Sequence, residues 1–193
     1  MWRTFRLSEL SDGGRNDAED ILLIRLREVL PEGVNVTLLA DRGFGSVALY
    51  AMLDDWGWNY VIRFRKGTLV TSAKGETKLA EEWISPKGHA KSLAHARVTK
   101  EEYELGAFVS IQAKGMKDAW LLATNLEGQK ARDVVNLYAK RFTIEETFRD
   151  QKDPRFDLGM NHTRVKTPER RDRILLLAAL AQTLLTLLGA AGE

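Results

Sequence analysis

The sequence predicts an α/β protein with a β-rich insertion, and three patterns along the chain support this prediction. Helical and strand-like segments alternate between residues 17 and 65, which is the order of a layered sheet. From 66 to 117, glycines separate short stretches in which apolar and polar residues alternate. Two long segments with helical periodicity, 130–152 and 167–188, follow. We therefore expect one α/β core that the β-rich segment interrupts.

The first part of the chain gives the elements of this core in order. "WRTFRL" (2–7) is a strand candidate, and a helix over 17–30 is ended by the turn sequence "PEG". The branched and apolar residues of "VNVTLLA" (34–40) predict a strand. "GSVALYAMLDDWG" (45–57) then predicts a helix, and "WNYVIRFR" (58–65) predicts another strand.

The last part of the chain is predicted to complete the core. "AWLLATNL" (119–126) predicts a buried strand, which a long helix follows. The last helix is the most apolar, but its uninterrupted apolar run is shorter than the roughly 18 residues of a membrane span, so we expect a buried core helix and no membrane partner. The predicted division is a core part at 1–65, an antiparallel β insertion at 66–117, and a second core part at 118–193.

Composition excludes some classes of site and leaves the partner open. The 193 residues are 44% hydrophobic, enough for one substantial core, and the net charge of +2 is only weakly attractive to polyanions. The chain has no cysteine, which excludes disulfides and thiolate metal sites and fits a cytoplasmic protein. Its three histidines, His89, His95 and His162, are too scattered along the chain for a zinc site.

Asp41 is the first candidate site residue. It directly follows a predicted strand inside "LLADRGF", and strand ends of an open α/β sheet are where ligands bind. An aspartate before a glycine is also common in ordinary turns, so both interpretations stay open for this residue taken alone.

The helix sequence "YAKRFTIEETFRDQK" (138–152) contains the second candidate group. In a continuous helix that turns by about 100° per residue, four of its polar side chains lie within a stripe about 60° wide. They are Tyr138, Arg141, Glu145 and Lys152. A solvated, ion-paired surface would explain them, and so would a phosphodiester site in which the carboxylate binds a divalent metal and the cations bind phosphate.

Together, "LLADRGF" and the Y-x2-R-x3-E-x6-K pattern resemble the DDE transposases of insertion sequences. More narrowly, they are similar to the insertion-sequence-four branch with its Tyr-Arg-Glu-Lys signature, which includes the Tn-five transposase. The four signature positions are all matched, and Glu145 follows Asp41 by 104 residues (145 − 41). The resemblance covers about residues 2–188.

This resemblance implies a ribonuclease-H-like core with a β insertion, and DNA cleavage and strand transfer during transposition. Two Asp and one Glu of the family bind two Mg²⁺ or Mn²⁺ ions for in-line attack on phosphorus. By resemblance, Asp41 is the second acid and Glu145 the third, and both bind metal. Tyr138, Arg141 and Lys152 would contact DNA phosphates near the cut. The implied partners are transposon-end DNA and a second copy of the protein, in the cytoplasm and associated with the nucleoid.

Two further residues match DNA-contacting positions of the family. Trp120 matches a tryptophan that accommodates a displaced base, and stacking on an aromatic face is a sound basis for that role. A core tryptophan is the other interpretation. Arg63 matches a DNA-contacting arginine and forms a basic cluster with Arg65 and Lys66, although exposed strand ends are also often basic.

The first catalytic Asp of the family has no counterpart before Asp41. Asp12 lies in a predicted loop, and Asp17 and Asp20 lie at a helix start, where capping explains them. We therefore expect a core truncated at its N-terminus that lacks its first strands. An upstream segment that supplies the missing Asp is a possible partner.

Three hypotheses follow. The chain is the catalytic part of a transposase that is inactive alone, a decayed remnant, or a non-catalytic DNA-binding protein. The missing central strand would also leave strand edges open for pairing with another chain.

Overall fold

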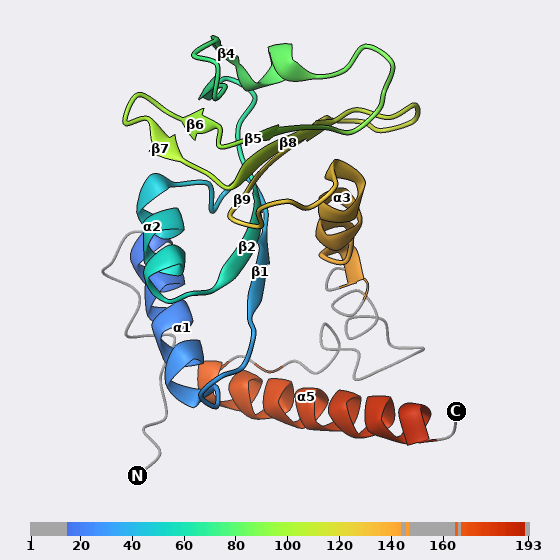
Figure 1. The fold of residues 1–193 in the computed structure, drawn as a ribbon. Coiled ribbons are helices and arrows are strands. Elements are labelled where there is room, and N and C mark those ends of the chain that lie inside the picture. Colours follow the sequence, from blue (N-terminus) through green and yellow to red (C-terminus); the bar gives the residue numbers. More distant parts are fainter. Residues whose placement is uncertain (1–14, 144–145, 147–164, 166, 192–193) are drawn as a thin grey trace. The chain divides into compact units, whose positions relative to one another are not determined.

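The structure is a computed structural model whose parts form two compact units. One unit consists of Met1–Leu23 and Phe142–Glu193, and the other of Ile24–Arg141. The second unit contains both β-sheets (Figure 1). The predicted α/β class is confirmed, since the described part contains four α-helices and two sheets. The structure describes residues 15–143, 146, 165 and 167–191.

Sheet A has five strands in the order β1-β2-β9-β8-β5. Its first pair is parallel, and the other neighbours are antiparallel. Strand β1 forms one edge, and no strand of the described chain pairs with its outer side. The strands, in chain order, are β1 (Thr37–Ala40), β2 (Asn59–Arg63), β5 (Lys91–Ala94), β8 (Ala107–Ile111) and β9 (Trp120–Thr124).

Sheet B is smaller and antiparallel throughout, in the order β4-β3-β6-β7. All its strands lie within 66–117, where the alternating sequence predicts antiparallel strands. The same segment also contributes β5 and β8 to sheet A, so its strands continue the main sheet through β9. The elements are β3 (Leu69–Thr71), β4 (Thr77–Leu79), the 3₁₀-helix η2 (Ala80–Trp83), β6 (Arg97–Val98) and β7 (Tyr103–Glu104).

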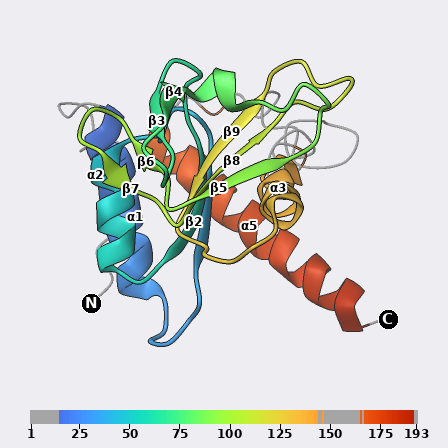
Figure 2. The ribbon, with the colours of Figure 1, turned by 45° about the horizontal axis from the view of Figure 1, so that its top comes forward.

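Two helices cover opposite faces of sheet A, α2 (Val47–Asp55) and α3 (Ala131–Ala139), as both ribbon views show (Figures 1 and 2). The core under α3 joins strand residues of three neighbouring strands to the helix. Its fully buried members are Val61, Val109, Leu122, Val134 and Tyr138. This packing fixes Tyr138 against the middle of the sheet.

A hydrogen-bonded junction ties the other face together around Asn125. The Asn125 side chain accepts from the backbone N–H of Tyr60 (3.0 Å) and donates to the carbonyl of Trp58 (2.9 Å). It also donates to Asp54 of α2 (2.7 Å). Asp54 accepts a second bond from the Tyr103 hydroxyl of β7 (2.5 Å), which links the strand of sheet B to α2.

The helix predicted over 130–152 is interrupted. Helix α3 ends at Ala139, because the backbone N–H groups of Lys140 and Arg141 bond to carbonyls three residues back, at Leu137 (3.2 Å) and Tyr138 (3.0 Å). Such bonds tighten the last turn of a helix. The prediction of one uninterrupted helix over 130–152 is therefore wrong at residues 140–141.

Helices α1 (Arg15–Val29) and α5 (Pro168–Ala191) form close to where the sequence predicts them. The prediction that the last helix is a buried core helix stays a prediction. Ala178 is buried, but seven leucines between 176 and 188 are 53–68% exposed. The helix carries leucines around most of its circumference, as a helix that is covered on several sides does.

Within the described residues, none of the helices combines the length and apolar content that crossing a bilayer requires. The predicted strand at 2–7 lies outside the described residues.

Candidate functional site

The carboxyl ends of β1 and β2 bring two predicted site residues together. The strands are parallel, with Ala40 opposite Ile62, so Asp41 and Arg63 leave the sheet at the same edge. Strand β9 is antiparallel to β2 and begins at this edge. The N–H of Phe64, just after β2, bonds there to the carbonyl of Leu121 (2.9 Å). The site thus forms where three strands end or begin.

Asp41 is held by a tight turn between β1 and α2. Its carbonyl accepts from the N–H of Phe44 (2.9 Å), and its Oδ1 accepts from the N–H of Arg42 (2.8 Å). Ser46 then caps α2 through its hydroxyl, which accepts from the N–H of Leu49 (3.2 Å). The Asp41 side chain is 42% exposed. The turn therefore fixes a carboxylate that stays open to solvent.

Arg63 lies between two carboxylates. Its Nη1 is 3.9 Å from Oδ1 of Asp41, and its Nη2 is 3.9 Å from Oδ2 of Asp118. The same Nη2 donates to the carbonyl of Ala119 (2.9 Å), and the side chain is only 15% exposed. Arg63, predicted to contact DNA, is thus anchored beside the candidate metal ligand.

Tyr138 and Trp120 pack against each other on the α3 face of the sheet. Their ring centroids are 5.0 Å apart in an edge-to-face arrangement, with Tyr138 fully buried and Trp120 half-buried. The guanidinium of Arg141 lies beside the Tyr138 ring, with its Cζ 5.8 Å from the centroid. The structure therefore brings these three predicted DNA-contacting residues into one cluster.

Burial and nearby charges shift the pKa of the Tyr138 hydroxyl. Burial, and next the negative charge of Asp41, raise its pKa, while the guanidiniums of Arg141 and Arg63 act in the opposite direction. The phenol is therefore protonated at neutral pH, which leaves it able to donate a hydrogen bond. Within the described part of the chain, its oxygen is buried without a hydrogen-bond partner.

Because that hydroxyl has no partner among the described residues, the Tyr138→Phe substitution is expected to change the free energy of unfolding by less than about 1 kcal/mol. Urea unfolding followed by circular dichroism measures this. A loss of more than about 2 kcal/mol would mean that the hydroxyl is bonded in the folded chain, since a lost buried partner costs that much.

Two of the four signature residues lie outside the described residues, namely Glu145 and Lys152. The structure describes Tyr138 at the end of α3 and Arg141 just beyond it. Because the helix stops between these two residues, their proximity comes from the tight last turn and not from a continuous helical stripe.

Asp41 has the oxygen chemistry that Mg²⁺ and Mn²⁺ prefer, and it is accessible. Among the described side chains, however, no three of His, Cys, Asp and Glu gather closely enough to bind a metal ion. Asp41 therefore fits one ligand position of such a site, and Glu145 would have to add the second.

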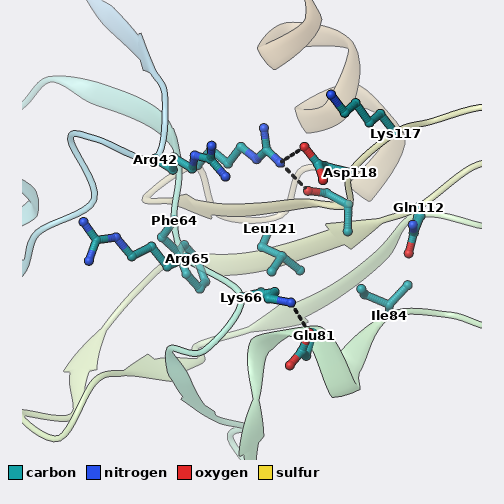
Figure 3. Close-up of a pocket in the computed structure, with 12 residues that line it drawn as sticks. Arg42, Phe64, Arg65, Lys66, Glu81, Ile84, Gln112, Lys117, Asp118 and Leu121 are labelled. Atoms are coloured by element: carbon teal, nitrogen blue, oxygen red, sulfur yellow. Dashed lines mark hydrogen bonds and ion pairs between the residues drawn. The ribbon is translucent and has the colours of Figure 1, made fainter.

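A basic pocket of about 520 Å³ lies between the end of β2, the start of β9 and η2 (Figure 3), and it is lined by Arg63, the neighbour of Asp41. Sequence reasoning identified only part of it, the cluster at the end of β2. The other charged residues come from separate segments of the chain. The only feature of the sequence that could have identified them is their position next to a predicted strand end. The charged lining residues are Arg42, Arg63, Arg65, Lys66, Glu81, Lys117 and Asp118.

A family model described as the transposase DDE domain matches residues 6–184. None of the curated proteins matches the chain. The matched range includes Asp41, Arg63, Trp120 and the whole signature segment, and it covers most of the chain. DDE transposases generally use divalent metal ions, act on DNA and serve transposition. The chain therefore belongs to the transposase DDE domain family.

Proposed function

We propose that the chain forms part of a metal-dependent phosphoryl-transfer centre that cuts and joins DNA strands in transposition, as in the insertion-sequence-four branch. The observation that carries this proposal is the position of the Asp41 carboxylate beside the Arg63 guanidinium, at the edge where the parallel strands β1 and β2 end. A carboxylate for metal beside cations for phosphate is the arrangement that phosphodiester chemistry requires.

In this proposal Asp41 and Glu145 hold Mg²⁺ or Mn²⁺, which would activate the attacking water or 3′ hydroxyl and stabilise the leaving oxygen. Arg63, Arg141 and Lys152 bind phosphate oxygens, Arg side chains in a bidentate fork. Tyr138 is a predicted phosphate contact whose hydroxyl is buried in the structure, so it can donate to DNA only if the residues that cover it move. These groups position the phosphodiester next to Asp41 and offset its charge.

Trp120 is proposed to stack on a displaced base, a role that its partly exposed indole supports. This role and core packing are compatible, because the edge-to-face contact with Tyr138 holds the indole in one orientation.

The fold that accompanies this function is proposed to be a ribonuclease-H-like core with residues 66–117 as its insertion. The parallel pair of β1 and β2, with Asp41 at the end of β1, supports this assignment. The remaining carboxylate, the first Asp of the family, is proposed to come from a strand that pairs with the outer edge of β1. That edge has no partner in the described chain.

The test is a nicking assay on supercoiled plasmid DNA with Mn²⁺, alongside a DNA-binding assay. Mn²⁺-dependent nicking that EDTA removes is the expected result for a complete centre. If the chain binds no DNA even at low salt, the proposal is wrong.

A second candidate is a non-catalytic DNA-binding protein. It is favoured by the well-formed basic pocket together with the lack of a three-carboxylate cluster among the described residues. It predicts salt-dependent DNA binding that EDTA leaves unchanged, and no nicking at any Mn²⁺ concentration.

A further inference from the structure

Two cations of the basic pocket are already paired with carboxylates. Nζ of Lys66 lies 3.7 Å from Oε2 of Glu81, and Nη2 of Arg63 lies 3.9 Å from Oδ2 of Asp118. Figure 3 shows Lys66 turned toward Glu81 across the pocket. Both carboxylates are accessible, with 42% of the Glu81 side chain and 60% of the Asp118 side chain exposed. An incoming anion must therefore displace a carboxylate before it can pair with Lys66 or Arg63.

The backbone keeps each pair in place. The N–H of Glu81 bonds to the carbonyl of Lys66 (3.3 Å), which sets the start of η2 against the end of β2. Arg63 donates to the carbonyl of Ala119, the residue after Asp118. Each acid is thus positioned by the fold next to its cation, although the two partners are far apart in the sequence. Hydrogen bonds to backbone groups of the fold therefore hold both ion pairs in the pocket.

Such pairs exchange easily with another anion. An exposed ion pair, such as that of Lys66 with Glu81, contributes only about 0–1 kcal/mol, so little is lost when it opens, and Arg63 keeps its bond to the Ala119 carbonyl when Asp118 leaves. A phosphodiester carries one negative charge on two oxygens, as a carboxylate does, and an Arg fork binds either group. With five cations and two acids lining it, the pocket has a net charge of +3 (5 − 2), which favours a polyanion.

We propose that Glu81 and Asp118 are internal substitutes for phosphate, which DNA phosphodiester groups displace from Lys66 and Arg63. The two acids keep the cations positioned before DNA arrives, and they lower the affinity of the pocket because DNA must compete with them. This inference rests on the proposed DNA-binding function and adds to it the residues that tune it. Arg63 also lies 3.9 Å from Asp41, so a phosphate bound to Arg63 would lie close to the candidate metal ligand.

The test measures binding of a short labelled DNA duplex by fluorescence anisotropy between about 50 and 200 mM salt. Glu81→Gln and Asp118→Asn are each expected to tighten binding by about 3- to 10-fold at the lowest salt, since each removes a competing anion. Lys66→Gln is expected to weaken binding by a similar factor and to reduce the slope of log K against log salt by about 1.

Matched controls separate a local effect from bulk charge. Glu127→Gln and Lys74→Gln make the same charge changes at exposed positions that do not line the pocket. If Glu81→Gln binds no more tightly than Glu127→Gln, and Lys66→Gln no more weakly than Lys74→Gln, the exchange proposal is overturned. Tight binding of inorganic phosphate alone, with unchanged DNA affinity of Lys66→Gln, would assign the pocket to a small free anion and also overturn it.

The failure of this inference is distinguishable from the failure of the proposed function. A wild-type chain that binds no DNA at low salt rejects both. A wild-type chain that binds DNA while all pocket variants match their controls rejects only the exchange, and leaves Asp41 and its neighbours as the proposed site.

Discussion

In a chain complemented by the segment that supplies the missing catalytic Asp, replacing Asp41 by Asn is expected to lower the rate of Mn²⁺-dependent DNA cleavage on the order of 1000-fold. The carboxylate sits at the end of β1 with its side chain open to solvent and Arg63 beside it. An amide at this position keeps the size and the turn but binds a divalent ion poorly. Losing metal stabilisation of the transition state costs several kcal/mol, which corresponds to that factor.

Two measurements check this prediction. Plasmid nicking reports the reaction, and Mn²⁺ binding followed by electron paramagnetic resonance needs no turnover. Asp41→Asn is expected to weaken Mn²⁺ binding by more than about 10-fold. Asp55→Asn makes the same change at an exposed position at the end of α2 and serves as the control. Equal Mn²⁺ affinity of Asp41→Asn and wild type would show that Asp41 is not a metal ligand.

Replacing Gly106 by Ala is expected to destabilise the fold by about 3 kcal/mol. A Cβ at Gly106 would lie 2.7 Å from the backbone carbonyl carbon and oxygen of Asn125, which is closer than real contacts allow. Relief requires moving Asn125, whose side chain bonds to Tyr60, Trp58 and Asp54. The substitution therefore strains the junction between sheet A and α2 as well as the local contact.

Urea unfolding of the purified variant measures this loss. Gly67→Ala is the matched control, because a Cβ there meets nothing within 4 Å and the backbone is not in the left-handed region. It is expected to change the free energy of unfolding by less than about 1 kcal/mol. A Gly106→Ala variant as stable as this control would mean that β8 and the segment after β9 shift apart at little cost.

Local sequence signals predicted the elements that carry the site. Strand β1 and helix α2 were predictable because a run of branched and apolar residues, a strand-end aspartate and a helical segment occur in order. The proximity of Asp41 and Arg63 was not predicted, although consecutive strands joined by a helix commonly pair in parallel, as β1 and β2 do.

Features that depend on the three-dimensional fold were not predictable. The end of α3 at Ala139 has no glycine or proline to mark it, and a switch to bonds three residues back leaves no sequence pattern. Glu81 and Asp118 come from segments far from their cations, so no spacing rule associates them with the site. The exposed leucines of α5 show a related limit, because apolar sequence predicts a tendency to be covered but does not supply the neighbour.

The pairing of β2 with β9 also affects how fast the chain folds. Val61 lies opposite Thr124, 63 positions later (124 − 61), so the centre of sheet A forms only when a long loop closes. The hairpins within that loop involve shorter separations and lose less chain entropy when they form. The insertion should therefore assemble early, and the edge that carries Asp41 should be completed late, in the slowest step of folding.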